Sequence, residues 1–313
     1  MSEPTPARPR MIIDCDPGVD DAMAIIAAAR WADLVGITTV AGNVPLEHTT
    51  ANACRLRSML GLDVEVHAGA DGPLVGEQEF ARHVHGETGL GDVVLPEPDR
   101  GPDSEDAVAY LVETTRSEEG LHLVPIGPLT NVALALRADP GLAHRVASIT
   151  LMGGSALGVG NVSAAAEFNA FADPEAADQV FRSGAKLRML GLNLTHQVRM
   201  GAIHAAECQT IGSPVGDAMA GLLEFYTVFH LAEEDVADGP VHDPCAVLAV
   251  THPELFTLEA RSVQVELAGA HTRGMTLVDE RGPWATAEAN CEVAYGVDAD
   301  AVIALIMKAV REA

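Results

Sequence analysis

Four aspartates fall within eight residues near the start of the chain. Asp14, Asp16, Asp20 and Asp21 follow a short apolar run and lead into a segment rich in alanine and isoleucine. Carboxylates crowded in this way repel one another at neutral pH, so the cluster is costly unless a cation compensates its charge. Oxygen ligands suit hard cations such as Ca²⁺ or Mg²⁺ better than zinc. An acid-rich helix start would account for Asp20 and Asp21 but not for the other two, so we predict a hard-cation site.

A further carboxylate, Asp243, stands far along the chain between His242 and Pro244. Taken alone, this triplet also fits an ordinary helix start, with the aspartate as N-cap and the proline in the first helical position. Beside a cation site formed elsewhere, Asp243 becomes a candidate ligand. His242 becomes a candidate proton donor, because histidine titrates near neutral pH.

Asn161, Glu167 and Asn169 form a third group of interest. A polyhydroxylated sugar needs both hydrogen-bond donors and acceptors, and asparagine and glutamate side chains that converge on a pocket supply them. In isolation these residues also fit ordinary polar loop positions, so their interpretation depends on what lies beside them.

Short β-branched runs alternate with longer helical patterns through the first two thirds of the chain. We expect strands at residues 11–15, 35–40, 64–67, 121–125, 148–152 and 186–190, and helices at residues 20–30, 46–60, 106–116, 129–137 and 174–182. This alternation is typical of an α/β fold in which helices cover both faces of a mostly parallel sheet. Such sheets bind ligands outside the carboxyl ends of their strands, and the aspartate cluster directly follows the first expected strand.

The last third of the chain has a different pattern. We expect helices at residues 217–231 and 244–250, strands at 262–267, 275–278 and 291–295 that extend or flank the main sheet, and a closing helix at 299–311. No repeat or linker is visible in the sequence, so we expect one domain over residues 11–313. Residues 1–10 lack the apolar core of a secretory signal and are expected to form a short disordered leader.

Composition excludes several classes of protein. A net charge of −26 argues against a nucleic-acid-binding protein, which needs a concentrated basic surface. No apolar run approaches the roughly 20 residues that span a bilayer, so no membrane association is expected. The cysteines are odd in number and scattered, which suits reduced thiols in a cytoplasmic protein; they are Cys15, Cys54, Cys208, Cys245 and Cys291.

Several separated motifs resemble those of the nucleoside hydrolase family, of the inosine–uridine-preferring type. In chain order they are DCDPGVDDAMAI from Asp14, TTVAGN ending at Asn43, HVHGETG from His83, VPIGPLTN from Val124, LMGG from Leu151, AEFNAFADPEAA from Ala166, LTHQ from Leu194 and VHDPCAV from Val241. They extend over roughly residues 11 to 311, nearly the whole chain. The DxDPGxDD signature is specific, and the number of motifs in family order makes coincidence implausible.

The resemblance implies a Ca²⁺-dependent N-ribohydrolase with a Rossmann-related, mostly parallel open sheet flanked by helices. By similarity, the calcium ligands are the side chains of Asp16, Asp21 and Asp243 and the main-chain carbonyl of Ile126, where the family often carries threonine. Asp16 is then the general base that activates water, and Asp14 is a supporting carboxylate. The resemblance also implies that the protein forms a homodimer or homotetramer and acts in purine or pyrimidine salvage.

The resemblance also implies which residues contact the substrate. Asp20, Asn43 and Asn169 resemble residues that bind the ribose diol, Asn161 and Glu167 resemble those that bind the 5′ hydroxyl, and Met152 packs on the sugar. The loop with His83 and His85 is expected over the active site; an HxH pair can also bind zinc, but no further cysteine or histidine has supporting spacing. The helix at residues 224–230 is expected to help form the base pocket, with His230 where some relatives place a tyrosine.

Base preference and two rival functions remain open. Aromatic residues make up only 4% of the chain, and the two tryptophans are Trp31, at the end of the first expected helix, and Trp284, in a late loop. A pyrimidine-preferring or broad-range enzyme is therefore favoured over one that sandwiches a purine between tryptophans. An aspartyl-phosphate phosphatase would use Asp14 as nucleophile with Mg²⁺, but Pro17 follows the second aspartate of the motif and the chain has few lysines. A non-catalytic nucleoside- or ribose-binding protein would tolerate loss of Asp16, which is present.

Overall fold

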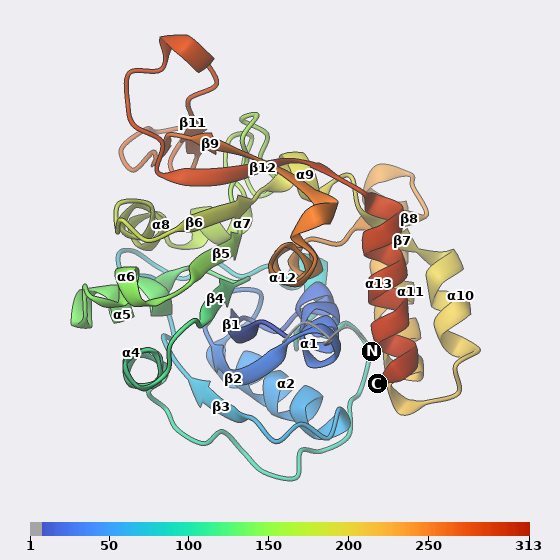
Figure 1. Cartoon of the computed structure of the whole chain (residues 1–313). Helices are drawn as coiled ribbons and strands as arrows, with labels where there is room; N and C mark the ends of the chain where they lie inside the picture. Colours follow the sequence, from blue (N-terminus) through green and yellow to red (C-terminus); the bar gives the residue numbers. More distant parts are fainter. Residues whose placement is uncertain (1–7) are drawn as a thin grey trace, which may run out of the picture.

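The computed structural model describes residues 8–313. The first seven residues of the expected leader lie outside this part, and the first strand begins at Arg10, one residue before the expected start. The main sheet has eight strands in the order β3-β2-β1-β4-β5-β6-β12-β9 (Figure 1). These strands are β1 (Arg10–Cys15), β2 (Asp33–Thr39), β3 (Glu65–Ala68), β4 (His122–Pro125), β5 (Ser148–Met152), β6 (Leu187–Leu190), β9 (Phe256–Arg261) and β12 (Cys291–Val297).

Neighbouring strands of this sheet are parallel, except for the antiparallel pair β12 and β9 at one edge. The central strands are buried almost throughout, and all residues of β5 are buried. Strands of a parallel sheet that is covered on both faces are apolar without alternation, which is why short runs such as SITLM mark them in the sequence. The predicted fold class, a mostly parallel open sheet flanked by helices, is confirmed.

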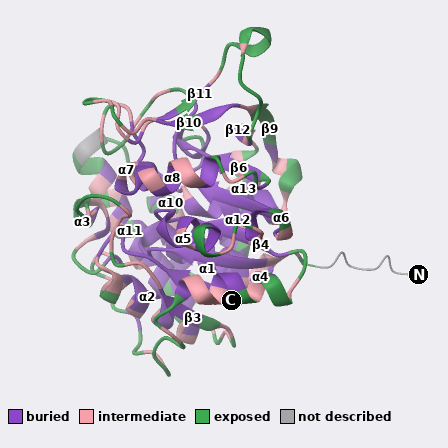
Figure 2. Ribbon diagram, turned by 90° about the vertical axis from the view of Figure 1, so that its left-hand side faces the viewer, coloured by how far each residue is buried: buried purple, intermediate pink, exposed green. Residues whose placement is uncertain are grey.

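Helices cover both faces of the sheet (Figure 1). One layer contains α1 (Val19–Trp31), α2 (Leu46–Met59), α12 (Asp243–Thr251) and α13 (Ala299–Glu312), with α10 (Ala202–Gln209) and α11 (Pro214–Glu234) packed beside α13. The other layer contains α4 (Ala107–Ser117), α5 (Thr130–Ala138), α6 (Leu142–Arg145) and α8 (Pro174–Phe181). Buried apolar side chains form one large cluster under each layer, and the buried interior is visible in Figure 2.

Short elements complete the chain. Three short helices, α3 (Arg82–His85), α7 (Phe168–Ala172) and α9 (Leu192–Thr195), carry residues of the candidate site described below. Two small antiparallel pairs join β7 (Arg199–Gly201) to β8 (Asp238–Pro240) and β10 (Val263–Val265) to β11 (Thr276–Val278). Two 3-10 turns lie at Pro253–Leu255 and Gly282–Trp284. Within residues 8–313, no helix is long and apolar enough to cross a membrane.

The last third of the chain differs in detail from the expectation. The strands expected at 262–267 and 275–278 pair only with each other, as β10 and β11, and flank the main sheet. The sheet is instead extended by β12, which was expected, and by β9, which was not. Most side chains of β9 are not buried, so this edge strand has no apolar run to mark it.

Candidate active site

The candidate site lies where the strand order reverses. β1 is bordered by β2 on one side and by β4, much later in the chain, on the other. Crevices at such reversals are where open α/β sheets bind ligands. The peptide N–H of Ile126, just after β4, donates to the carbonyl of Asp14 over 2.8 Å, so the two strand ends are joined. A cavity of about 410 Å³ opens here, and Ile126 and Met152 are among its lining residues.

Three buried carboxylates converge beside this cavity. Oxygen atoms of Asp20, Asp21 and Asp243 lie within 4.8 Å of one another. Asp20 and Asp21 stand in the first turn of α1 and Asp243 in the first turn of α12, and these two helices pack side by side. His242, not Asp243, is the N-cap of α12, so the interpretation of Asp243 as a plain helix cap is wrong.

The cavity beside these carboxylates supplies no permanently cationic side chain from the part of the chain that the structure describes. No lysine or arginine is among the described residues that line the cavity. Burial raises the pKa of Asp21, and the charge of Asp20 raises it further; burial and then the charges of Asp20 and Asp21 raise the pKa of Asp243. Buried like charges that share no counter-charge fit a bound cation, and an all-oxygen ligand set fits a hard divalent one.

Asp16 lies beside this group in a cradle that only glycine allows. Its Oδ2 accepts a hydrogen bond of 2.6 Å from the peptide N–H of Asn43. A Cβ atom on Gly42 would lie 2.1 Å from Asp16 Oδ2, and one on Gly127 would lie 2.4 Å from Asp16 Oδ1. The carboxylate is therefore fixed between two backbone segments. Burial raises the pKa of Asp16 well above its usual range, and the charge of Asp21 adds to the effect.

Asp14 and Asn43 support the cluster. Asp14 Oδ1 accepts hydrogen bonds from Thr38 Oγ1 (2.6 Å) and Asn131 Nδ2 (2.8 Å). Burial raises the pKa of Asp14 to about 6, and these two hydrogen bonds oppose the shift. The side-chain amide of Asn43 donates to the carbonyl of Asp16 and to Asp21 Oδ2, both over 3.1 Å. Asn43 lines the cavity, and it also positions two of the carboxylates.

Comparison with known proteins identifies the family. The family model described as inosine-uridine preferring nucleoside hydrolase matches residues 11–304. The chain belongs to this family. A curated pyrimidine-specific ribonucleoside hydrolase RihA from Shewanella woodyi is 41% identical over 306 residues, which cover 96% of this chain and 97% of the relative. A RihA from an Enterobacter species is 43% identical over 274 residues, 86% of this chain and 87% of the relative.

Solved structures agree. A plant nucleoside hydrolase matches with a TM-score of 0.92 at 33% identity, covering 98% of this chain and 100% of the other. A purine-preferring ribonucleoside hydrolase from Gardnerella vaginalis matches with a TM-score of 0.91 at 32% identity, covering 97% and 98%. The protein is thus an N-ribohydrolase, and the prediction that it is an enzyme of this class is confirmed.

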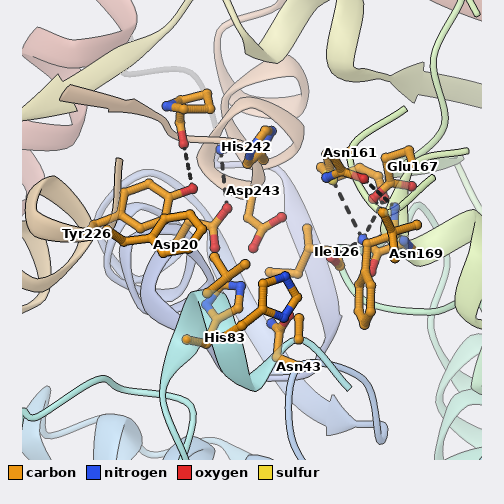
Figure 3. Close-up of a pocket in the computed structure, with 18 of the residues that line it drawn as sticks. Asp20, Asn43, His83, Ile126, Asn161, Glu167, Asn169, Tyr226, His242 and Asp243 are labelled. Carbon is orange, nitrogen blue, oxygen red and sulfur yellow. Dashed lines mark hydrogen bonds between the residues drawn. The ribbon is translucent and has the colours of Figure 1, made fainter. Parts of the chain in front are cut away.

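One end of this nucleoside hydrolase's cavity is lined by groups suited to a sugar (Figure 3). Asn169 Nδ2 donates to the carbonyl of Ile126 over 2.8 Å, so that carbonyl already accepts one hydrogen bond. Glu167 accepts hydrogen bonds from the peptide N–H groups of Gly154, Asn169 and Ala170. Burial nevertheless raises the pKa of Glu167 to about 7. Asn161 Oδ1 accepts a hydrogen bond of 2.9 Å from the peptide N–H of Phe168, which fixes the loop that carries Asn161 to the start of α7.

Histidines and aromatic rings line the other end of the cavity; they are His83, His85, His196, Tyr226, Phe229, His230 and His242. His242 Nδ1 lies 2.7 Å from Thr195 Oγ1, and burial lowers the pKa of His242 to about 4, so the ring is neutral at pH 7. His85 Nδ1 accepts from the peptide N–H of Val19 over 3.2 Å and so holds the start of α1. Trp31 and Trp284 are not among the lining residues.

The cavity gathers all of the residues predicted to contact the substrate; these are Asp20, Asn43, His83, His85, Met152, Asn161, Glu167, Asn169 and His230. It also gathers His242, Ile126 and Asp243, whereas Asp14, Asp16 and Asp21 are not among its lining residues. Their individual roles remain predictions. The sequence did not single out His196, Thr195 or Asn131, although each lies inside a motif that carried the family resemblance.

Proposed function

We propose that the enzyme hydrolyses the N-glycosidic bond of pyrimidine ribonucleosides with the help of Ca²⁺, releasing free base and ribose. The observation that carries the proposal is a cavity with three distinct parts. Buried carboxylates border it, with no lysine or arginine among its described lining residues, while sugar-type polar groups line one end and histidines line the other. This arrangement matches the three parts of the reaction: an activated water, a ribose and a leaving base.

Asp16, Asp21, Asp243 and the carbonyl of Ile126 are the proposed calcium ligands. The close group of oxygens from Asp20, Asp21 and Asp243 supports a cation at this point and brings Asp20 to it as well. When bound, the cation would lower the pKa of a water molecule and hold the ribose diol in a fixed position. Asp14, held by Thr38 and Asn131, supports the cluster from behind.

The protein's own groups account for the remaining chemistry. Asp16 is the proposed general base, because its carboxylate is buried, accepts a hydrogen bond from the peptide N–H of Asn43 and is closely approached by Gly42 and Gly127. Burial and the charge of Asp21 raise its pKa. As the bond from C1′ to the base breaks, the sugar becomes cation-like, and the surrounding carboxylates stabilise that charge. His242 is the proposed donor to the leaving base. Since its ring is neutral at pH 7, it acts by hydrogen-bond donation, as a neutral imidazole can in a buried site.

The sugar contacts follow from the lining groups. Asp20, Asn43 and Asn169 are proposed to bind the 2′ and 3′ hydroxyls. Asn161 and Glu167 are proposed to bind the 5′ hydroxyl, with Met152 packed against the ring. Each of these side chains is already fixed by a hydrogen bond or by burial, so little order has to be imposed when substrate binds.

Pyrimidine preference is proposed on two grounds. The relatives at 41–43% identity are named pyrimidine-specific, whereas the purine-preferring relative of known structure is 32% identical. The base end of the cavity also lacks a tryptophan among its described lining residues. His83 and His230 are proposed to contact the base. The enzyme is further proposed to be cytoplasmic and homodimeric or homotetrameric, as the family resemblance implies, and to act as one domain in nucleoside salvage.

The two rival functions find less support. A phosphatase would use Asp14 as nucleophile, but Asp14 is buried, is not among the cavity's lining residues and is hydrogen-bonded on one oxygen by two side chains. A non-catalytic binding protein that had lost turnover could have lost the proposed base or ligands, but Asp16, Asp21 and Asp243 are all present.

A panel of ribonucleosides assayed for free base, with and without a calcium chelator, tests the proposal. We expect uridine and cytidine to be cleaved faster than inosine, activity to disappear with chelator and return with calcium, and Asp16→Ala to show no turnover. Full activity of Asp16→Ala would refute the assignment of the base. Binding of uridine by the calcium-loaded wild type without any cleavage would favour the binding protein, and release of phosphate from a sugar phosphate would favour the phosphatase.

A further inference from the structure

Thr195, which is buried, and His242, which is partly buried, form a hydrogen-bonded pair at the base end of the cavity. Thr195 is the last residue of α9 and is completely buried. Its Oγ1 lies 2.7 Å from Nδ1 of His242, which is the N-cap of α12 and lines the cavity. The peptide N–H of His242 donates to Asp20 Oδ2 over 3.3 Å. The backbone of His242 is therefore held by the carboxylate cluster, and its ring is held by Thr195.

Hydrogen bonds from neighbouring residues hold the short segment that carries Thr195 in place. Asn193, in the same short helix, donates from Nδ2 to the carbonyl of Ala294 in β12 over 2.8 Å. Its Oδ1 accepts from the peptide N–H of Ala156 over 3.0 Å. Gln197, just beyond the helix, donates to the carbonyl of Tyr295 over 3.0 Å. The segment is thus fastened to the main sheet on one side and to the loop after β5 on the other.

The partner of one imidazole nitrogen decides what the other can do. A neutral imidazole carries one hydrogen, on either Nδ1 or Nε2. When the Thr195 hydroxyl donates to Nδ1, the hydrogen of His242 must lie on Nε2. Nε2 is then the nitrogen that can donate to a base bound in the cavity. A threonine hydroxyl fixes the ring without adding a negative charge next to an already acidic site.

We propose that Thr195 is a positioning residue that orients His242 and holds its hydrogen on Nε2, facing the leaving base. The inference rests on the proposed function of this cavity. As the C1′–N bond breaks, its electron pair stays with the base, and Nε2–H donates a hydrogen bond to the base atom where that charge collects. Without the Thr195 hydroxyl, the ring can rotate or carry its hydrogen on Nδ1, and the base leaves without this help.

A comparison of two substrates tests the inference. Uridine has a poor leaving group that needs a hydrogen-bond donor, whereas p-nitrophenyl β-D-ribofuranoside releases a stable phenolate without one. For Thr195→Val we expect kcat on uridine to fall by about 10- to 100-fold, part of the roughly 10²- to 10⁴-fold that a positioned acid contributes. We expect its KM for uridine and its kcat on the p-nitrophenyl substrate to stay within about 3-fold of wild type.

Two further variants separate positioning from packing. Thr195→Ser keeps the hydroxyl and should retain most activity on uridine. Thr115→Val makes the same change at a buried threonine of α4 that is not among the cavity's lining residues, and it should leave both substrates unaffected. An equal loss on both substrates in Thr195→Val would assign Thr195 a purely structural role, and unchanged uridine turnover would overturn the proposal.

The imidazole nitrogens give a measurement that does not depend on turnover. In ¹⁵N-labelled protein, with the signals of His242 assigned by the His242→Asn variant, we expect hydrogen on Nε2 in the wild type and a mixture of tautomers in Thr195→Val. Hydrogen on Nδ1 in the wild type would overturn the inference even if uridine is cleaved. Absence of cleavage of any ribonucleoside would overturn the proposed function, and the spectra would still decide the role of Thr195.

Discussion

Replacing Asp243 by asparagine should reverse its effect on stability when calcium is removed. In the absence of a cation, Asp243 is buried with Asp20 and Asp21 and has no cationic side chain among the lining residues. The Asp243→Asn variant keeps the size of the side chain and removes one negative charge. We therefore expect the variant to be more stable than wild type in chelator, and less stable than wild type in calcium because it has lost a proposed ligand.

The magnitude follows from the distances in the cluster. Two unit charges at 4.8 Å repel by about 3 kcal/mol at an effective dielectric constant of 20. Partial protonation relieves some of this, so a gain of about 2–3 kcal/mol is expected for the variant in chelator. Calcium at about 10⁴ times its Kd should stabilise the wild type by roughly 5.5 kcal/mol, which exceeds the variant's gain by about 2–3 kcal/mol if the variant no longer binds calcium. At about 2 °C per kcal/mol for a chain of this size, each difference corresponds to roughly 4–6 °C in Tm.

The pH dependence of this difference has a definite sign. Because the pKa of Asp243 is raised by burial and by its neighbours, the folded protein without calcium holds protons that the unfolded chain releases. Its stability therefore falls as pH rises above the ordinary range of aspartate. The advantage of Asp243→Asn in chelator should therefore grow as the pH rises.

Thermal unfolding in EDTA and in calcium chloride measures these effects. Glu113→Gln makes the same change of charge at an exposed position of α4 and should follow wild type in both buffers. If Asp243→Asn is destabilised equally with and without calcium, the carboxylates do not repel one another in the folded protein. If EDTA leaves the wild-type Tm unchanged, the cluster holds no cation, and the expected difference between the two buffers is refuted.

Three further changes test other parts of the structure. Gly127→Ala places a Cβ 2.4 Å from Asp16 Oδ1 and should lower kcat by about 10²-fold through displacement of the base, whereas unchanged kcat would show that the cradle can relax. Arg57→Met removes a guanidinium that is 1% exposed and donates hydrogen bonds to one carboxylate and two main-chain carbonyls. Chemical denaturation should show that the free energy of unfolding falls by about 3 kcal/mol. Arg55→Met, which breaks an ion pair at the surface, should lower it by less than about 1 kcal/mol. Burial raises the pKa of Glu167 to about 7, so the free energy of unfolding measured in calcium should fall by roughly 2 kcal/mol between about pH 5.5 and pH 7.5. If Glu167→Gln shows the same fall with pH, Glu167 is not the group that titrates.

The sequence was sufficient for the elements that are buried on both sides. The strand expected at residues 148–152 is β5 with the same bounds, and β1 starts one residue earlier than expected. β9 and α10 were missed for a common reason. Most side chains of β9 are not buried, and in α10 only Ala205 and Cys208 are buried. Elements at the surface carry no apolar pattern, so composition and periodicity do not reveal them.

The candidate site was predictable where its residues are close in sequence or lie in recognisable motifs. The four aspartates of the first motif stand within eight residues, and their repulsion alone indicated a cation. The contact of Asp20 with the peptide N–H of His242 joins residues 222 positions apart, and only the packing of α1 against α12 creates it. The role of Asn131, which links Asp14 to the carbonyl of Thr39, likewise depends on strand order that the sequence does not state.

The first turn of α12 couples the two halves of the proposed chemistry. Asp243 carries a carboxylate of the cation cluster, and the preceding residue, His242, is the proposed donor to the leaving base. Asp20 contacts both, since its carboxylate lies with that of Asp243 and accepts the peptide N–H of His242. A cation that draws Asp20 and Asp243 together therefore also fixes the backbone of the histidine, while Thr195 fixes its ring. Loss of the cation should consequently loosen His242, so chelation is expected to impair departure of the base as well as activation of water.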